Sequence, residues 1–375
     1  MQQANEMKVP LSLCFVDFEK AFDSISRKTM GKIMRYYGIP QIFVDVVMNI
    51  HADTFCKVMV DGCLSDSFEV KSGVLQGGIL SPILFILVID YVMKNVVEET
   101  GVGIVWKDGR LLTDLDYADD IVLICNHPRE MQTVLNSLIR EGSKVGLNIN
   151  RKKTEIINMN MQNPEECVID GSIVKQVDRF KYLGTILAKD GSLNLEYDER
   201  LRRANQAMGL LKTVWSSNNF SIHTKIKIYK TMVRTILLYG HESWYSTTAT
   251  DKKFLVFENK ALRRILGISW RDRVSNARIR EITKLQPVDE YVRHSRWKWL
   301  GHVYRRVGSI VNDTPAYEMQ GRRGRGRPKE TWLRTMKREA GEECWGSLEE
   351  MAQDRWWWRV FIEALCIPEG ATGYD

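Results

Sequence analysis

The sequence predicts an α+β fold, because two hydrophobic patterns follow one another along the chain. Up to about residue 192, short apolar runs of strand length alternate with stretches whose apolar residues recur every three or four positions. Beyond that point only the helical spacing continues. The Asp-Gly pairs at 61–62 and 170–171 are typical of tight hairpin turns, so we expect a largely antiparallel sheet with helices packed on one face.

Strands are expected where apolar or alternating residues lie between turn residues. These runs cover residues 11–18, 54–62, 67–73, 114–124, 153–159, 166–175 and 180–187, with 114–124 forming a hairpin by itself. Helices are expected between them: one ending at Gly38, one with Ser81 as its N-cap and Pro82 in its first position, and one after Pro128.

The second half of the chain predicts helices from residue 192 to about residue 285. One apolar face is formed by Leu201, Ala204, Met208, Leu211 and Trp215. The last ninety residues are basic, rich in Gly and Trp, and less periodic. We therefore divide the chain into three parts, residues 1–191, 192–285 and 286–375.

The composition is that of a folded globular protein with one basic segment. With 375 residues, of which 44% are hydrophobic and 27% charged, the chain can bury a sizeable core. Its net charge of +7 is unevenly spread, because residues 291–340 hold 13 Lys and Arg against 4 acids. That asymmetry favours a polyanion-binding segment over a generally basic protein.

The cysteines and the apolar runs indicate a soluble, intracellular protein. Seven cysteines without a C-x-x-C pair disfavour both a disulfide framework and a zinc module. The longest apolar run, residues 83–89, is far shorter than the ~20 residues of a membrane-spanning helix, and the N-terminus lacks a signal-peptide pattern. We expect no membrane partner and a location in the nucleus or the cytoplasm.

The stretch DLDYADDIVLI, residues 114–124, places Asp119 and Asp120 side by side between apolar residues. Adjacent acids are common on solvated turns, but the apolar flanks predict that this pair lies at the tip of a buried hairpin. Asp17 ends another apolar strand, so three carboxylates converge if the two strands are neighbours. Such a cluster is unfavourable unless divalent cations neutralise it. Oxygen ligands without nearby His or Cys indicate two Mg²⁺ or Mn²⁺ ions, which support phosphoryl or nucleotidyl transfer.

Five segments of the chain together carry a family resemblance. They are FVDFEKAFDSI, SGVLQGGILSPILF, YADDIVLI, GLNINRKKTEII and FKYLGTIL. Their order and approximate spacing resemble the palm motifs of reverse transcriptases, and most of all those of LINE-type (non-LTR) retrotransposons. The later segments LLYGHESW, RWKWLGHVYRR and GRGRPKETW resemble the region that follows the palm in such elements.

The resemblance implies an RNA-directed DNA polymerase with a right-hand palm over residues 1–191, a helical thumb over 192–285 and a nucleic-acid-binding region over 286–375. Its partners would be an RNA template, a DNA primer and deoxynucleoside triphosphates. The implied roles are metal ligation by Asp17 and Asp119 with Asp120 adjacent, general-acid catalysis by Lys153, ribose discrimination by Phe22, nucleotide and template packing by Gln76 and Gly77, and a primer grip of Tyr182, Leu183 and Gly184.

Several of these residues have a simpler interpretation beside the functional one. Phe22 follows Ala21 and is equally well a core residue, and Lys153 is the last of three consecutive basic residues, a pattern more typical of a solvated face. Gly77 is equally well part of a turn before a helix. Asp23 is expected to form local hydrogen bonds rather than to bind metal.

The Gly and Pro residues of GRRGRGRPK disfavour a helix, so the segment is expected to be extended. The basic side chains projecting from it are Arg322, Arg323, Arg325, Arg327 and Lys329. We favour nonspecific phosphate contacts, although residues 325–328 also resemble an AT-hook core and a nuclear-localisation role stays open. The tryptophans at 297, 299, 345 and 356–358 either stack on unpaired bases or form a small core. His294 and His302 have no nearby cysteines, which disfavours a zinc knuckle.

Two other functions fit part of the pattern. A non-catalytic nucleic-acid-binding remnant of such an element would keep the fold and the basic segment without polymerase activity. An intron-encoded maturase shares the palm motifs but matches the later segments less well.

In the family, a fingers region whose basic residues clamp the triphosphate lies upstream of the first motif, usually after an endonuclease domain, whereas sixteen residues precede Asp17 here. We therefore expect weak or no polymerase activity from this chain alone. Primer extension on an RNA template with Mg²⁺ checks this expectation, and robust synthesis by the purified chain would contradict it. Supplying the upstream segment in trans is expected to restore synthesis.

Overall fold

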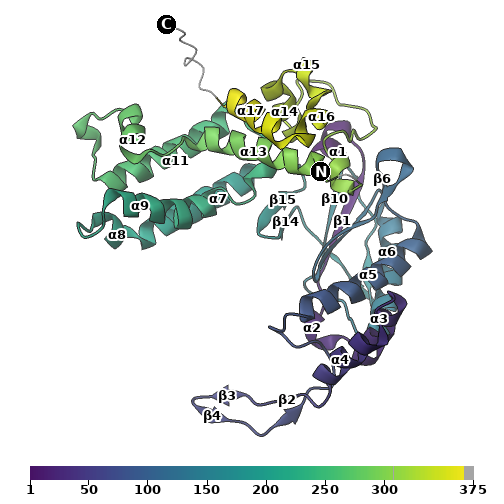
Figure 1. The fold of residues 1–375 in the computed structure, drawn as a ribbon. Coiled ribbons are helices and arrows are strands. Elements are labelled where there is room, and N and C mark those ends of the chain that lie inside the picture. The colour runs from purple at the N-terminus through teal and green to yellow at the C-terminus, as the bar shows by residue number, and fades with distance from the viewer. Residues whose placement is uncertain (307, 367–375) are drawn as a thin grey trace. The chain divides into compact units, whose positions relative to one another are not determined.

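The computed structural model describes residues 1–306 and 308–366, and these form two compact units. The first comprises Gln3–Phe180 together with Met319–Arg323, and the second comprises Lys181–Glu318 and the chain from Gly324 onward. Strands and helices are mixed in the first unit and helices dominate the second (Figure 1), so the predicted α+β class is confirmed. The three-part division into residues 1–191, 192–285 and 286–375 stays a prediction.

A five-stranded sheet forms the centre of the first unit. Its strand order is β13 (Lys175–Gln176), β10 (Glu155–Met159), β1 (Leu11–Val16), β9 (Asp120–Cys125) and β8 (Asp114–Tyr117). All neighbouring strands are antiparallel except β10 and β13, which are parallel. The expectation of a largely antiparallel sheet is therefore confirmed.

β1 is the central strand because all six of its residues are apolar or small enough to be buried on both faces. On one face, Cys14 and Val16 belong to the same core cluster as residues of α5 (Ser81–Thr100) and α6 (Pro128–Val145). On the other face, the ring of Phe15 stacks on Phe180 with 4.0 Å between centroids. Burial on both sides explains why the sequence of β1 shows a continuous apolar run rather than alternation.

The helices of the first unit pack against one another and against the sheet. α6 contacts both β1 and β9, and α5 packs along α6 (Figure 1). The apolar residues of α6 that enter the core are spaced as in an amphipathic helix, with Met131, Leu135 and Leu138 buried. The remaining helices of this part are α1 (Gln2–Met7), α2 (Ala21–Ser24), α3 (Arg27–Tyr36) and α4 (Gln41–His51), with a short 3₁₀ turn at Lys107–Gly109.

The prediction that Ser81 is the N-cap of α5 is wrong. Leu80 occupies the cap position, and Ser81 is the first helical residue. The hydroxyl of Ser81 donates a hydrogen bond to the backbone carbonyl of Leu75 instead of accepting one from the helix. The preceding turn, in which the Ser81 amide donates to Gly78, already fixes the direction in which the chain enters the helix.

The two predicted tight turns are confirmed, but the ladders beside them are short. Asp61-Gly62 joins β3 (Met59–Val60) to β4 (Cys63–Leu64), and β2 (Phe55–Cys56) pairs with β5 (Phe68–Glu69) further along the same ribbon. Asp170-Gly171 joins β11 (Val168–Ile169) to β12 (Ser172–Ile173). All four turn residues have positive φ, the conformation in which Asp and Gly are tolerated best. A further pair, β6 (Ile104–Val105) and β7 (Leu111–Leu112), was not expected.

The predicted single strand over residues 180–187 is in fact two strands. β14 (Arg179–Tyr182) and β15 (Thr185–Ala188) pair with each other around Leu183 and Gly184. Both turn residues have positive φ, 45° and 84°. The apolar pattern runs through the turn without a break, which is why it resembles one strand.

The helices of the second unit surround two core clusters. Over residues 192–285 they are α7 (Asn194–Leu210), α8 (Lys212–Ser216), α9 (Ile222–Ile228), a π-helical turn (Tyr229–Arg234), α10 (Thr235–Leu237), α11 (Thr248–Leu266) and α12 (Asn276–Thr283). The later helices are α13 (Val288–Tyr304), α14 (Trp332–Ala340), α15 (Glu342–Trp345), α16 (Leu348–Gln353) and α17 (Arg355–Leu365). Short 3₁₀ turns lie at His241–Ser243, Trp270–Asp272 and Ile310–Asp313. The helical prediction for residues 192–285 is confirmed.

The tryptophans of the last ninety residues differ in burial. Trp297 and Trp358 lie in the core cluster formed by α13, α14, α16 and α17, and their side chains are 0% and 3% exposed. Trp356 and Trp357 are exposed on α17. A small core is therefore the correct interpretation for the first pair.

Gly73 and Gly62 offer a matched test of backbone crowding. Both have φ near +80°, but a Cβ at Gly73 would lie 2.5 Å from the Cα of Asp23, whereas nothing lies within 4 Å of one at Gly62. We expect Gly73→Ala to lower the free energy of unfolding by about 3 kcal/mol and Gly62→Ala by about 1 kcal/mol. Thermal unfolding followed by circular dichroism measures both. Equal losses would contradict the close approach of Gly73 to Asp23.

Candidate active site at the end of the central strands

The pairing of β1 with β9 brings the three predicted acids to the same end of the sheet. Val16 pairs with Ile121, so the next residues along the two antiparallel strands, Asp17 and Asp120, lie opposite one another. In the β8–β9 hairpin Tyr117 pairs with Asp120, so Ala118 and Asp119 form the two-residue turn. Asp119 therefore lies directly before Asp120. The expectation that the two acid-bearing strands are neighbours is confirmed.

The charges of these carboxylates act on one another. Burial raises the pKa of Asp120 above its ordinary value, and the negative charges of Asp119 and Asp17 raise it further. The Oδ2 atom of Asp17 is buried and accepts no hydrogen bond. A buried carboxylate oxygen without a hydrogen-bond donor costs free energy, so Asp17 Oδ2 depends on nearby positive charge, which the ammonium group of Lys153 supplies in this conformation.

The prediction of a buried hairpin tip is only half correct. β9 is buried from Ile121 to Cys125, but Leu115 and Tyr117 of β8 are exposed. Asp119 is half-buried and Asp120 is exposed. The pair therefore lies at an accessible rim of the sheet, where a substrate can reach it.

The turn that carries Asp119 is held in an unusual conformation. Ala118 has a φ of 55°, which places a residue with a Cβ in the left-handed region. Such a conformation is uncommon for alanine and is retained only where the surroundings impose it. Here the hydrogen-bonded ladder on both sides of the two-residue turn imposes it.

Lys153 lies beside the first acid. Its Nζ is 3.4 Å from Asp17 Oδ2, although the lysine side chain is largely exposed. The backbone of this region is fixed by two contacts: the Asn150 amide donates to the Asp17 carbonyl at 2.7 Å, and the Asp17 amide donates to Thr154 Oγ1 at 3.3 Å. Sequence reasoning missed Asn150 and Thr154, although both lie within the motif that contains Lys153.

The donor chemistry of the site fits a hard divalent cation, but the carboxylates are not arranged as a ready-made set of ligands. Asp17 has an unsatisfied buried oxygen, and all three side chains are oxygen donors. Across residues 1–306 and 308–366, no group of three or more His, Cys, Asp or Glu side chains is placed to hold a metal ion. The nearest positive charge to Asp17 Oδ2 in this conformation is that of Lys153.

The segments that carry Phe22 and Gln76 lie side by side in another part of the first unit. The Phe22 ring stacks on Phe85 with 4.4 Å between centroids and is half-buried, so it is partly a core residue. The Val74 amide donates to the Phe22 carbonyl at 2.8 Å, and Gln76 Nε2 donates to Asp23 Oδ1 at 3.0 Å. The side chain of Asp23 therefore bonds to a residue far away in the sequence, and the expectation of a local hydrogen bond is wrong for this contact. Gly77 is exposed, and its surroundings are open.

The turn containing Leu183 and Gly184 is held by residues of the second unit that sequence reasoning missed. Tyr239 donates its hydroxyl to the Leu183 carbonyl at 2.9 Å, and Arg200 donates to the Gly184 carbonyl at 2.6 Å. Arg200 is itself in a buried ion pair with Glu196. The acid and the base are four residues apart on α7, a spacing that is visible in the sequence as a helical ion pair.

The basic segment is exposed and irregular, as predicted. The residues from Arg322 to Lys329 are exposed and lie outside helices and strands. All seven cysteines are free. None of the helices in the described ranges is long and apolar enough to cross a bilayer.

Two family models match the chain. The reverse transcriptase (RNA-dependent DNA polymerase) model matches residues 1–187, which include the sheet and all three acids. A domain of unknown function matches residues 207–239. The first match agrees with the geometry of β1, β8 and β9 described above.

Three relatives share substantial similarity with the chain. A transposon-derived protein of Caenorhabditis elegans is 30% identical, over 53% of this chain and 74% of its own length. The Pol polyprotein of the type-2 retrotransposable element R2DM of Drosophila melanogaster is 32% identical, over 46% of this chain and 17% of its own length. The RNA-directed DNA polymerase from the mobile element jockey of Drosophila funebris is 28% identical, over 72% of this chain and 30% of its own length.

These matches define the class of protein first, which is a reverse transcriptase. Within that class, the chain belongs to the family of non-LTR retrotransposon reverse transcriptases. It spans less than a third of the length of the two Drosophila proteins.

Asp120 provides a test of the electrostatics of the site. Because its pKa is raised in the folded protein, its contribution to stability is fully present below its ordinary pKa and is lost as the pH rises through the raised value. Asp120→Asn removes this destabilisation, so we expect the Tm at pH 7 in EDTA to rise by about 1 °C, a small effect because solvent screens the exposed side chain. The increase in Tm should vanish at acidic pH, where Asp120 is protonated.

Thermal unfolding across pH measures this effect, with Asp66→Asn, an exposed acid in the β2–β5 ribbon, as the matched control. An increase of the same size in Asp66→Asn, or a gain that persists in acid, would contradict the mutual repulsion of the three carboxylates.

Proposed function

We propose that this chain is the polymerase core of a non-LTR retrotransposon reverse transcriptase, which extends a DNA primer with deoxynucleotides on an RNA template. The observation that carries the proposal is the register of β1 and β9, which sets Asp17 opposite Asp120 and beside Asp119. The proposal is supported by membership of the reverse transcriptase family and by similarity to the jockey protein, which is named as an RNA-directed DNA polymerase.

In this proposal Asp17 and Asp119 hold two Mg²⁺ or Mn²⁺ ions, with Asp120 adjacent. When bound there, the two ions would activate the 3′-hydroxyl of the primer and stabilise the charge of the departing pyrophosphate. The support for these ligands is their oxygen chemistry, their mutual repulsion and the unsatisfied Oδ2 of Asp17.

Lys153 has two successive roles. Its ammonium group lies near Asp17 Oδ2 and offsets the negative charge there. When the carboxylate turns to a cation, the exposed lysine is released and can donate its proton to the pyrophosphate oxygen as a general acid. The simpler interpretation of Lys153 as one member of a solvated basic face does not explain its contact with Asp17.

Phe22, Gln76 and Gly77 shape the nucleotide site. Stacking on Phe85 fixes the ring of Phe22, so the ring can exclude a ribose 2′-hydroxyl by contact. Gln76 is oriented by Asp23, and the open surroundings of Gly77 let a nucleotide or template approach the backbone closely.

Nucleic acid is bound elsewhere in the proposal. Residues 1–191 form the palm, residues 192–285 the thumb, and residues 286–375 a nucleic-acid-binding region. Tyr182, Leu183 and Gly184 contact the primer end, and the exposed basic segment contacts phosphates through Arg322, Arg323, Arg325, Arg327 and Lys329. We place the protein in the nucleus or the cytoplasm, where its templates are.

A second candidate is the non-catalytic nucleic-acid-binding remnant. The observation that favours it is the absence, among the described residues, of a ready-made group of metal-binding side chains. The remnant keeps the fold and the basic segment and makes no DNA.

Asp119→Asn and Asp17→Asn are each expected to abolish Mg²⁺-dependent primer extension, by at least about a thousandfold, because a neutral amide cannot balance the charge of the cations. The assay uses an RNA template, with the upstream segment of a relative supplied in trans. Asp66→Asn is the matched control and should retain activity. Synthesis by both site variants at the rate of the control would overturn the polymerase proposal in favour of another site.

Phe22→Ala tests ribose discrimination separately. Removing the ring opens the space that would hold a 2′-hydroxyl, so ribonucleotide incorporation should rise by about a hundredfold relative to deoxynucleotide incorporation. Competition between the two nucleotides in the same extension assay measures the ratio. An unchanged ratio, together with a lower Tm, would assign Phe22 to the core alone.

A further inference from the structure

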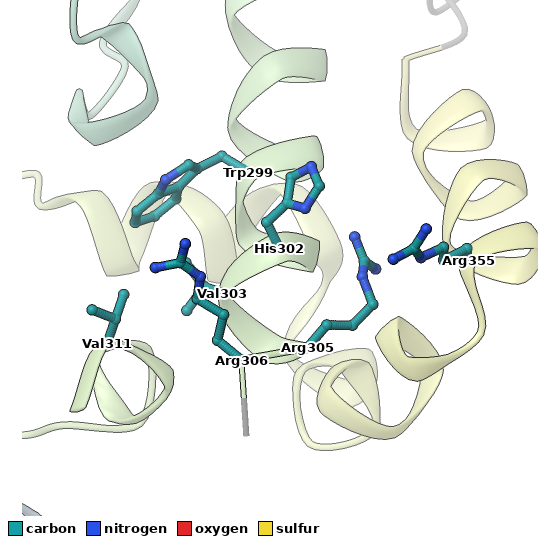
Figure 2. A pocket seen from close by; sticks show the side chains of 7 residues that line it. All are labelled: Trp299, His302, Val303, Arg305, Arg306, Val311 and Arg355. Carbon is teal, nitrogen blue, oxygen red and sulfur yellow. The ribbon is translucent and has the colours of Figure 1, made fainter. Parts of the chain in front are cut away.

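A pocket in the second unit carries an excess of positive charge that the polymerase proposal does not use. Its volume is about 470 Å³, and it lies between the end of α13 and the start of α17 (Figure 2). The side chains that line it are Trp299, His302, Val303, Arg305, Arg306, Val311 and Arg355. None of these seven residues is acidic.

The cationic groups in this pocket repel one another. The guanidinium groups of Arg305 and Arg355 point toward each other (Figure 2), and the charge of Arg355, after burial, lowers the pKa of Arg305. The pKa of His302 is lowered by burial and then by the charges of Arg305, Lys298, Arg355 and Arg306. His302, Arg306 and Arg355 are exposed, so water screens part of this repulsion, and an anion bound among the cations would relieve the rest.

Nearby acids do not supply that anion. Within the described ranges, no carboxylate pairs with the side chain of Arg306 or of Arg355. Asp354, the neighbour of Arg355, accepts hydrogen bonds from the backbone amides of Trp356 and Trp357 and is used as the cap of α17. Glu349 accepts a bond from Asn312 at 3.4 Å.

A purely structural role explains only part of the cluster. Arg305 is the C-cap of α13 and donates to the Ala352 carbonyl at 2.7 Å, and cations at the end of a helix are stabilised by its dipole. Arg355 has the opposite position, because it is the first residue of α17, where the dipole disfavours a cation. The dipole of α17 therefore does not account for the position of Arg355 beside Arg305.

Trp299 gives the pocket an aromatic wall. Its ring is half-buried and packs edge-on against Trp332 with 5.8 Å between centroids, which limits its motion. An aromatic ring next to arginines is the combination that single-stranded nucleic acids meet on their binding proteins, with the base on the ring and the phosphate on the cations. A paired base is not free to reach such a ring.

We propose that this pocket binds the backbone of single-stranded nucleic acid, with a phosphate between Arg305 and Arg355 and the adjoining unpaired base against Trp299, beside Arg306 (Figure 2). The inference rests on the proposed function, in which the chain works on an RNA template. It adds a binding site made by α13 and α17, separate from the exposed basic segment at residues 322–329.

The test compares the full chain with the double variant Arg306→Gln/Arg355→Gln. Fluorescence anisotropy with a labelled single-stranded RNA oligonucleotide, at low and moderate salt, measures the affinity and its salt dependence. We expect the double variant to bind about tenfold more weakly, with the slope of log affinity against log salt reduced by about 1. Trp299→Leu should weaken binding several-fold without changing that slope, since it removes no charge.

Arg359→Gln is the matched control, because Arg359 is exposed on the same helix one turn further along and does not line the pocket. The double variant should lose less affinity for a duplex of the same sequence than for the single strand. Equal losses in the control and the double variant, or equal losses for duplex and single strand, would overturn the inference. Circular dichroism and Tm exclude misfolding of each variant.

All binding measurements are made without nucleotides and are repeated in the Asp119→Asn background, so they do not depend on polymerase activity. If the double variant binds RNA as tightly as the unchanged chain while Asp119→Asn abolishes synthesis, the proposed binding pocket is wrong and the proposed polymerase function is retained. If RNA affinity depends on the pocket residues but the chain makes no DNA under any condition, the binding pocket is retained and the proposed polymerase function is wrong.

Discussion

The antiparallel pairing of β1 with β9 is the constraint on which the first unit depends. Side chains alternate between the two faces of a strand, so a shift of one residue would turn Cys14 and Val16 away from the core formed with α5 and α6. The same register sets Asp17 opposite Asp120. The free energy of hydrophobic burial therefore stabilises an arrangement of the three acids that their mutual repulsion opposes.

Charge is balanced differently in different parts of the molecule. In the second unit, the buried carboxylate of Glu258 is matched by Arg234 and Arg280, and that of Glu196 by Arg200. At the end of β1 and β9, where Asp17, Asp119 and Asp120 lie close together, Lys153 pairs with Asp17. In the pocket of α13 and α17, Arg305 and Arg355 converge and Arg306 lies across from them, without an acid in the lining. The first kind of site is complete in the protein alone, whereas the other two have the charge that cations and phosphates would complement.

The sequence was informative where a local rule decides the structure. The apolar run of β1, the spacing of α6 and the Asp61-Gly62 turn each follow from short-range chemistry, and each was predicted. The apolar pattern of residues 180–187 continues unbroken and predicted one strand, so the turn at Leu183-Gly184 was expected only from the family resemblance. Leu183 has a positive φ, and its carbonyl accepts a hydrogen bond from the distant Tyr239. The contact of Lys153 with Asp17 and the stacking of Phe22 on Phe85 likewise arise only when remote segments meet. Motif order indicated which residues are candidates for the site, but not the neighbours that orient them.

The left-handed alanine beside Asp119 has a consequence for how the site evolved. Glycine at position 118 would adopt the same backbone without strain, but it would also let the tip of the hairpin sample other shapes. Alanine restricts the conformations of the turn, and the cost is the strain of a left-handed backbone at a residue with a Cβ. The backbone strain at Ala118 is therefore accompanied by a more rigid turn around Asp119.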